Sequence, residues 1–362
     1  MHDTESGNFA TLLECLNPQY VAAVSLHARE QQAEEPREVG EEALQKALRD
    51  DRRPRRVRVA AMQYLLGPIN SFEEFATQIQ FFVRSAAEYG CQFVVFPEYF
   101  TLQLLSYLVE LSPARAVRRL AQLTPDDEKV FNRLATENRL YIIAGTHPVV
   151  EEGQLFNAAH LFTPTGQVFR QKKVHLTPTE KSLYQISRGH GFYVYHTEYG
   201  RIAILVCYDV EFPEVARVLA EAGAEILFVL SCTDHRQGFC RVRYCAQARA
   251  MGNQIYVVMA GIVGNQPQVP HMTANYSQAA IMTPSDYFFA RDGIAAEGNI
   301  NQEQMVISDV DLDLLREQRV NGTVVPLKDL IKETYDRVIH YTDQRDDASS
   351  QSQTDSDAPL HV

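Results

Sequence analysis

Runs of apolar residues alternate with amphipathic segments along most of this chain. Five consecutive apolar residues, 202–206, predict a strand buried on both faces, and a second run, 226–230, predicts its neighbour. Between them Pro213 stands where the first turn of a helix accepts proline, and apolar residues recur over 215–219. We therefore predict a strand–helix–strand unit, the building block of α/β proteins.

The same alternation extends from residue 57 to residue 318. We predict strands at residues 57–63, 93–96, 140–145, 157–162, 168–170, 202–206, 226–230, 255–260, 279–282 and 305–310, and helices at 72–89, 113–138, 213–219, 241–251 and 312–318. This order indicates an α/β fold, although periodicity alone does not separate a layered sandwich from a doubly wound sheet.

The two ends of the chain differ from this middle part. Residues 9–48 carry apolar stripes at helical spacing in an acidic sequence, so we predict that residues 1–56 are a helical extension and a basic linker. The arginines of 52–56 could instead bind nucleic acid, but the acidic surroundings favour a solvated linker. Residues 343–362, rich in Ser, Asp and Gln, predict a disordered tail.

Composition narrows the classes of function. A chain of 362 residues with 45% hydrophobic residues can bury a large core. Its net charge of −12 argues against nucleic acid or an anionic membrane as the main partner. We find no signal-peptide pattern and no apolar run of membrane-spanning length, and we predict a cytoplasmic location. The six scattered cysteines are then expected to be reduced thiols.

Cys207 lies where the strand 202–206 gives way to a turn and a helix. Open α/β sheets place their chemistry at the carboxyl ends of strands. A nucleophile on such a turn has an exposed side chain, and the next backbone N–H, here that of Tyr208, is free to face a developing oxyanion. The alternative is a small core residue, because free cysteines are commonly buried. Position alone leaves both interpretations open.

Two charged residues also stand at the ends of predicted strands. Glu98 comes directly after the run 93–96 and Pro97, and an apolar setting should raise its pKa and suit a general base. A helix cap or a salt-bridge partner is the alternative for this residue. Lys173 precedes the apolar segment 174–176 at a strand end. Consecutive lysines usually form a solvated face, but this one could point inward and supply a fixed positive charge.

The motifs around these three residues resemble those of the nitrilase (carbon–nitrogen hydrolase) superfamily. They are Phe-Pro-Glu-Tyr-Phe at Glu98, Lys-Lys-Val-His-Leu at Lys173 and Val-Cys-Tyr-Asp at Cys207. The resemblance extends over residues 57–313 and includes short motifs at residues 143–146, 156–159, 163–166 and 247–253. It implies a four-layer α-β-β-α sandwich over residues 57–320 that pairs into an eight-layer dimer, with residues 321–342 as an arm at the dimer interface.

The resemblance also implies a Glu-Lys-Cys triad. Cys207 would be the nucleophile, Glu98 the general base and Lys173 the stabiliser of the oxyanion. The chemistry agrees, because a thiol needs a base to take its proton, and a nearby ammonium favours the thiolate. Glu180 resembles the second glutamate that many members place beside the triad. Its alternative is an exposed residue at the start of a helix.

Further residues are candidates for the wall of the pocket: Tyr99, Tyr208, Thr233 and His235. Cys232, His235, Cys240 and Cys245 also stand near zinc-ligand spacing. This segment follows a strand and runs into a helix, and the family needs no metal. We therefore predict no metal and no cofactor.

The residues after Cys207 indicate the substrate class. Nitrile-cleaving members commonly have Cys-Trp-Glu, whereas Cys207-Tyr208-Asp209 resembles amidases and carbamoylases, and this chain has no Trp. A glutamate that many relatives carry is replaced by Gly252, which puts a local ion pair in doubt but leaves the triad complete.

We predict a homodimer, or a larger homo-oligomer, that hydrolyses a small non-peptide amide through a thioester and releases ammonia or an amine. The alternatives are nitrile or N-carbamoyl hydrolysis, acyl transfer to an amine, and a non-catalytic assembly protein on this fold.

Overall fold

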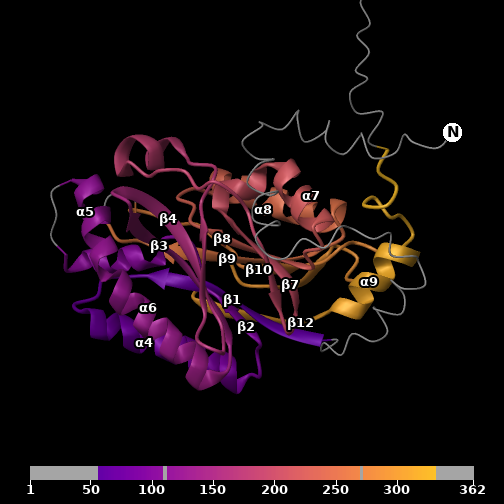
Figure 1. The fold of residues 1–362 in the computed structure, drawn as a ribbon, viewed down its shortest axis with the longest axis horizontal. Helices are drawn as coiled ribbons and strands as arrows, with labels where there is room; N and C mark the ends of the chain where they lie inside the picture. The colour runs from indigo at the N-terminus through magenta and orange to yellow at the C-terminus, as the bar shows by residue number, and fades with distance from the viewer. Residues whose placement is uncertain (1–55, 109–111, 270–271, 332–362) are drawn as a thin grey trace, which may run out of the picture. The chain divides into compact units, whose positions relative to one another are not determined.

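The computed structural model describes residues 56–108, 112–269 and 272–331 (Figure 1). The predicted amino-terminal helices and the predicted disordered tail lie outside these residues, as does half of the predicted arm, residues 332–342. None of the described helices is long and apolar enough to cross a membrane. The described cysteines are free thiols.

The described strands form one curled sheet with two halves. The strands are β1 (Arg56–Leu66), β2 (Phe93–Val95), β3 (Tyr141–Glu151), β4 (Gln154–Phe162), β5 (Val168–Lys172), β6 (Val194–Thr197), β7 (Gly200–Val206), β8 (Ile226–Ser231), β9 (Tyr256–Gly264), β10 (Ala280–Met282), β11 (Ile294–Glu297) and β12 (Gln304–Asp311). One half runs β5-β4-β3-β2-β1-β12, and the other runs β6-β7-β8-β9-β10-β11. They join where the end of β1 pairs in parallel with the end of β9.

The two halves pack face to face. Phe93 of β2 and Phe228 of β8 meet with their ring centroids 5.4 Å apart, within an apolar core that draws on both halves. The outer face of the first half is covered by α4 (Phe72–Glu88), α5 (Pro113–Leu120) and α6 (Thr124–Asn138). The outer face of the second is covered by α7 (Pro213–Glu221) and α8 (Arg236–Gly252) (Figure 1). This is the predicted α-β-β-α layering.

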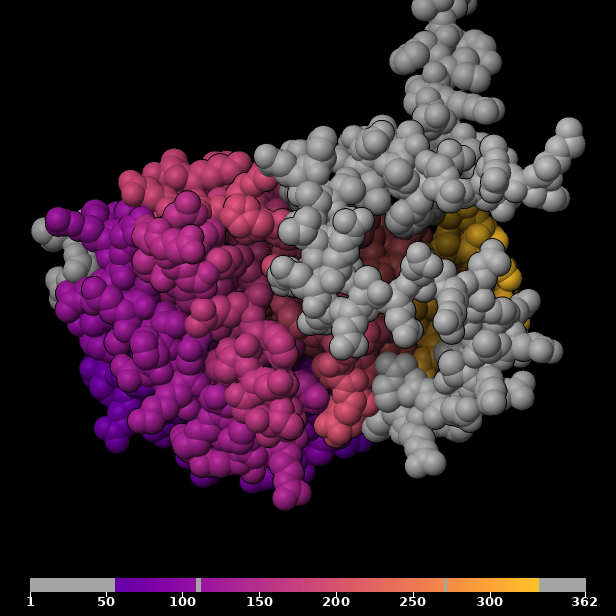
Figure 2. Space-filling model, in the orientation of Figure 1, coloured from indigo at the N-terminus to yellow at the C-terminus, as the bar shows by residue number. Residues whose placement is uncertain are grey.

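The space-filling view shows which parts of the chain lie side by side on one face of the molecule. Indigo-to-magenta atoms of the first half border the rose-coloured atoms of the residues that come next in the chain (Figure 2). A last helix, α9 (Leu312–Asn321), follows β12. Its Arg316 and Arg319 reach the second half, where Arg316 donates to the buried Glu225 and Arg319 to the Ala224 carbonyl.

The predicted strands and helices are present, with different boundaries at several places. The predicted helix 113–138 is divided, because a 3₁₀ turn at Ala121–Leu123 precedes Pro125 in the first turn of α6. β3 continues to Glu151, since it forms a long antiparallel pair with β4. α8 begins at Arg236, five residues before the predicted start at Arg241. The short strands β6 and β11 were not predicted, because their residues are only partly buried and lack an apolar run.

Gly145 allows β3 to pass close to the end of β2. Its φ is +56°, and a Cβ there would lie 2.2 Å from the Pro97 carbonyl oxygen and 2.6 Å from the Phe100 ring. A backbone oxygen can move away only by displacing Pro97, and with it Glu98. The glycine is therefore required for the approach that places Glu98.

We predict that Gly145→Ala destabilises the protein more than Gly153→Ala. Both glycines have positive φ, but a Cβ at Gly153 would meet no atom within 4 Å. Gly153→Ala should cost about 1–2 kcal/mol for the left-handed backbone. Gly145→Ala should cost that plus about 1–3 kcal/mol or more for overpacking. Urea denaturation of both variants measures the difference, and equal losses would contradict the steric argument.

Candidate active site

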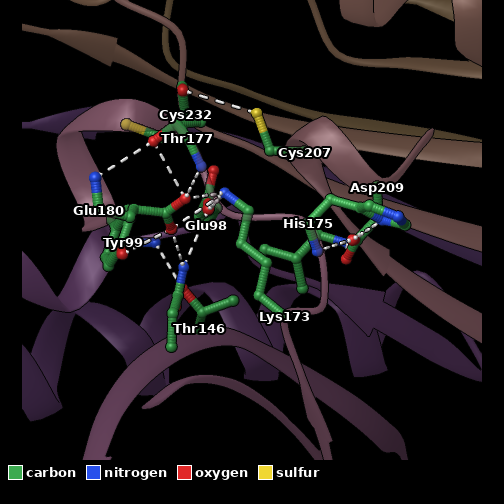
Figure 3. A network of polar contacts seen from close by, with 12 residues as sticks. Glu98, Tyr99, Thr146, Lys173, His175, Thr177, Glu180, Cys207, Asp209 and Cys232 are labelled. Carbon is green, nitrogen blue, oxygen red and sulfur yellow. Dashed lines mark hydrogen bonds and ion pairs between the residues drawn. The ribbon is translucent and has the colours of Figure 1, made fainter. Parts of the chain in front are cut away.

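The three predicted triad residues come from separate segments of the fold. Glu98 follows β2, Lys173 follows β5 and Cys207 follows β7. The first two belong to one half of the sheet and the third to the other. Their exposed fractions are 1%, 2% and 6%. Figure 3 shows their side chains in one region, where the two halves contribute to a common cluster.

Lys173 lies between two carboxylates. Its ammonium donates to Glu98 Oε1 at 2.8 Å and lies 2.9 Å from Glu180 Oε2. The Asn157 amide donates to Oε1 of both glutamates, at 3.0 Å each. Burial of an ion is unfavourable unless it is paired and hydrogen-bonded, and these contacts meet that condition.

Glu180 accepts hydrogen bonds from further donors besides Lys173 and Asn157. The Tyr99 hydroxyl donates to its Oε1 at 2.8 Å, and the Thr177 backbone N–H donates to its Oε2 at 2.9 Å. The Thr177 hydroxyl donates to the same Oε2 at 3.1 Å. Glu180 begins a short π-helical turn, Glu180–Tyr184, but its side chain is buried. The structure thus differs from the alternative of an exposed residue at a helix start.

The surroundings separate the pKa values of the two glutamates. Burial raises the pKa of Glu98 to about 7, and the charge of Lys173 opposes part of this effect. Burial also acts to raise the pKa of Glu180, but the charge of Lys173 and the hydrogen bonds from Lys173, Thr177 and Tyr99 bring it below its usual value. At neutral pH Glu180 is therefore ionised, while Glu98 can accept and return a proton.

The pKa of Lys173 is raised well above its usual value. Burial alone would lower it, but the charges of Glu180 and Glu98 outweigh burial. The side chain therefore stays an ammonium at neutral pH. It is a buried positive charge between two carboxylates.

Cys207 stands at a strained point of the backbone. β7 ends at Val206, a 3₁₀ turn runs over Cys207–Glu211, and Cys207 has a φ of +49°. Residues with a side chain adopt this left-handed region at a cost, and such strain is common at functional sites. The thiol is buried rather than exposed as predicted, because the segment of Cys232 packs against it and places the Cys232 carbonyl oxygen 3.8 Å from Sγ.

The Cys207 thiol is held in its neutral form. Burial raises its pKa well above the usual value, the charge of Glu98 adds to this effect, and the charge of Lys173 opposes it. The thiol also interacts with the Glu98 carboxylate, where it favours the ionised form of Glu98. The charges of the carboxylate and the ammonium therefore act on the pKa of the thiol, and burial keeps the thiol protonated at neutral pH.

The four predicted pocket residues make different contacts. The Tyr99 hydroxyl is committed to Glu180, and the ring of Tyr208 lies edge-on to Phe212 with centroids 5.0 Å apart. The Thr233 hydroxyl donates to the Tyr276 carbonyl at 2.7 Å. The His235 side chain is 72% exposed and lies 3.6 Å from the Asp234 carboxylate. Of these four, only Tyr99 has its polar group in the cluster.

The segment considered for zinc does not gather its ligands. Within residues 56–108, 112–269 and 272–331, no three His, Cys, Asp or Glu side chains are arranged to hold a metal ion. The Cys232 thiol points to Asn275 Oδ1 at 3.7 Å. Arg236, Gln237 and Cys240, at the start of α8, line a cavity of about 330 Å³.

Asn157 is a site residue that sequence reasoning missed. It is fully buried on β4, and its amide joins the two carboxylates. The available signal was an amide alone in the apolar run Leu155-Phe156-Asn157-Ala158-Ala159, where a strand residue without a partner would be unfavourable. Thr177, His175 and Asp209 were missed too, since each acts by contact with another residue.

A four-layer sandwich that carries this cluster of thiol, ammonium and carboxylates defines a protein of the nitrilase type. The carbon–nitrogen hydrolase family model matches residues 57–320, and the chain belongs to this family. The match confirms the resemblance inferred from the three motifs.

The chain is also similar to two curated relatives and to one solved structure. The chain is 50% identical over 279 residues to the probable hydrolase YhcX of Bacillus subtilis, a match that covers 77% of this chain and 54% of that protein. The chain thus spans about half the length of this relative. It is 26% identical over 274 residues to the omega-amidase NIT2 of Xenopus tropicalis, which covers 72% of this chain and 91% of that protein.

The solved structure is that of Saccharomyces cerevisiae Nit3, a member of branch 10 of the nitrilase superfamily. It is 22% identical, with a TM-score of 0.62, and the match covers 75% of this chain and 97% of that one. At this identity the likeness establishes a shared fold.

We predict that Lys173→Met destabilises the protein by about 3–5 kcal/mol at pH 8, because it leaves two buried carboxylates without their cation. In the variant, burial keeps the pKa values of both carboxyl groups above their unfolded values. Such groups favour the fold while protonated, and that stability is lost as the pH rises through the folded pKa. The loss should therefore be smaller at pH 5 than at pH 8, measured by urea denaturation.

The adjacent lysine gives a matched control for this experiment. The Lys172 side chain is 27% exposed, lies 2.5 Å from Glu151 and sits over the Phe156 ring. Lys172→Met should cost about 1 kcal/mol or less at either pH, as is usual for a partly exposed pair. Equal losses of unfolding free energy in the two variants would show that the buried contacts of Lys173 stabilise the protein no more than the partly exposed pair of Lys172.

Proposed function

We propose that the protein hydrolyses a small non-peptide amide through a thioester on Cys207. One observation carries this proposal: the Lys173 ammonium is bound between Glu98 and Glu180, beside a thiol on a strained turn. A base with a pKa of about 7 can remove and return a proton near neutral pH. These are the groups that acyl transfer through a thiol requires.

In the first half of the reaction Glu98 takes the proton of the Cys207 thiol, and the sulfur attacks the amide carbon. The electron pair of the carbonyl moves to oxygen, and this oxyanion faces the Lys173 ammonium and the Tyr208 N–H. Glu98 then gives its proton to the amide nitrogen, the C–N bond breaks, and ammonia or an amine leaves. Donors of this kind typically contribute about 10²–10³ in turnover each.

In the second half water replaces the amine. Glu98 takes a proton from the water, whose oxygen attacks the thioester carbon. The second tetrahedral intermediate uses the same two donors. The C–S bond then breaks, the sulfur recovers a proton from Glu98, and a carboxylic acid is released. Glu180 takes no proton in this scheme, because it stays ionised and holds Lys173 in place.

An amide is our proposed substrate for two reasons. The cysteine is followed by Tyr208-Asp209, and one relative is an omega-amidase by name. A nitrile or an N-carbamoyl compound is a rival substrate, and transfer to an amine in place of water is a rival reaction at the same thiol. A screen of ammonia release over amides, carbamoyl compounds and nitriles separates the rival substrates.

The assembly and the location are proposals as well. We propose a homodimer in which residues 321–342 contact the partner copy, and a cytoplasmic location. Both rest on the family resemblance and on the sequence pattern. Light scattering of the full chain and of a chain that ends at residue 320 tests the first.

We predict that Cys207→Ala abolishes amine or ammonia release on every substrate of the panel, because no other group replaces the attacking sulfur. Circular dichroism and oligomeric state should be unchanged. Cys245→Ala is the control, since this half-buried thiol on α8 lies outside the cluster, and its turnover should equal that of the unmodified protein. Normal turnover in Cys207→Ala would remove the proposal.

We predict that kcat/KM for an uncharged amide falls as the pH is lowered through about 7. Glu98 must be ionised to take the thiol proton, and burial places its pKa at about 7. Activity is therefore present above this pKa and lost below it. A profile that stays flat between pH 5 and 8 would exclude Glu98 as the base.

A further inference from the structure

The Asp209 carboxylate links the turn of Cys207 to the segment that carries Lys173. We propose that Asp209 is a positioning residue, which fixes the distance between the nucleophile and the ammonium without touching the substrate. This inference rests on the proposed function, because it assigns a role within that reaction. It concerns a residue outside the triad and its second glutamate.

One oxygen of Asp209 holds the nucleophile's turn. Asp209 is fully buried, and its Oδ2 accepts the Val206 N–H at 3.3 Å. Val206 is the residue directly before Cys207, and a carboxylate that reaches back across a helical turn in this way caps it. Since the backbone of Cys207 is in the left-handed region, its conformation must be held by such contacts.

The other oxygen holds the lysine's segment. Oδ1 accepts the His175 backbone N–H at 2.8 Å and lies 2.9 Å from His175 Nδ1. His175 stands two residues after Lys173. Because Oδ1 is the acceptor, the ring nitrogen that meets it carries a proton. Figure 3 shows the His175–Asp209 pair beside Lys173 and apart from the cluster of carboxylates.

A ring contact links the same two segments a second time. The His175 ring lies face to face with Phe212, with centroids 3.7 Å apart and planes at 15°. Phe212 follows the turn Cys207–Glu211 and precedes α7. The segment after Lys173 is therefore fixed to the turn of Cys207 by hydrogen bonds on one side and by stacking on the other.

The consequence is a constraint on geometry across the two halves of the sheet. Lys173 comes from the first half and Cys207 from the second, so neither half alone sets their separation. A shift of about 1 Å in such a site can lower the rate by about 10². Loss of Asp209 should therefore affect the chemical step far more than the binding of substrate.

The test is Asp209→Asn, a change that keeps the shape of the side chain. Asparagine has one oxygen, so whichever way its amide faces, an N–H group meets either Val206 N–H or the His175 donors. We expect kcat to fall by about 10- to 100-fold while KM changes less than about threefold. Alkylation of Cys207 by iodoacetamide, followed by peptide mass mapping, should slow by about tenfold or more.

Asp127→Asn is the matched control. Asp127 on α6 is also buried, at 1% exposed, and within the described residues its carboxyl oxygens have no hydrogen-bond partner. Burial raises the pKa of its carboxyl well above the usual value, and the side chain lies on α6, outside the cluster. This variant should keep the kcat, the KM and the Cys207 alkylation rate of the unmodified protein.

His175→Phe tests the link from its other end. It keeps the backbone N–H bond and the stacking on Phe212 but removes the Nδ1 donor, and we expect a loss in kcat of about two- to fivefold. Combined with Asp209→Asn, the losses should be less than multiplicative, because both changes remove the same contact. If Asp209→Asn fails to fold, the test is the alkylation rate of Cys207 in His175→Phe. A slower rate supports the positioning role, and an unchanged rate overturns it.

The outcomes separate this inference from the proposed function. A folded Asp209→Asn with normal kcat and normal alkylation of Cys207 overturns the positioning role while the hydrolase stands. A lowered melting temperature with unchanged kcat per folded molecule overturns it too, since it shows a purely structural residue. Turnover that survives Cys207→Ala removes the proposed function, whereas the alkylation comparison still reports on Asp209.

Discussion

The fold is arranged around one interaction, the pairing of a buried ammonium with two buried carboxylates. Each ion would lose several kcal/mol on leaving water, and the mutual attraction offsets this only when the geometry is good and every remaining oxygen has a donor. Asn157, Tyr99 and Thr177 supply those donors. The segment that presents Glu98 must therefore be held at a fixed spacing, and Gly145 lets β3 approach the Pro97 carbonyl next to Glu98.

The second constraint is the seam between the halves of the sheet. Both carboxylates and the lysine belong to one half, and the thiol belongs to the other. Sheets in face-to-face contact keep their spacing because close-packed interiors deform little. The rings of Phe93 and Phe228 lie in that interior. Packing between the two halves of the sheet thus fixes where the thiol lies relative to the carboxylates and the ammonium.

The sequence predicted those parts that leave a local pattern. Buried strands such as 202–206 are visible as apolar runs. Glu98 and Cys207 follow such runs and Lys173 stands at a strand end, all three within motifs of the family. Residues that act on other residues leave no such trace, which is why Asn157 and Asp209 were missed. His235 was chosen from its place in the chain, but its side chain is exposed at the N-cap position of α8. The burial of the Cys207 thiol depends on packing between distant segments, which one sequence does not encode locally.

The raised pKa of the Cys207 thiol has a consequence for the resting molecule. Peroxides and other oxidants react with the thiolate far faster than with the neutral thiol. Burial raises the pKa of the Cys207 thiol and so keeps it protonated at neutral pH, which slows sulfenic acid formation. The same burial that raises the pKa of the Cys207 thiol therefore limits its reaction with oxidants.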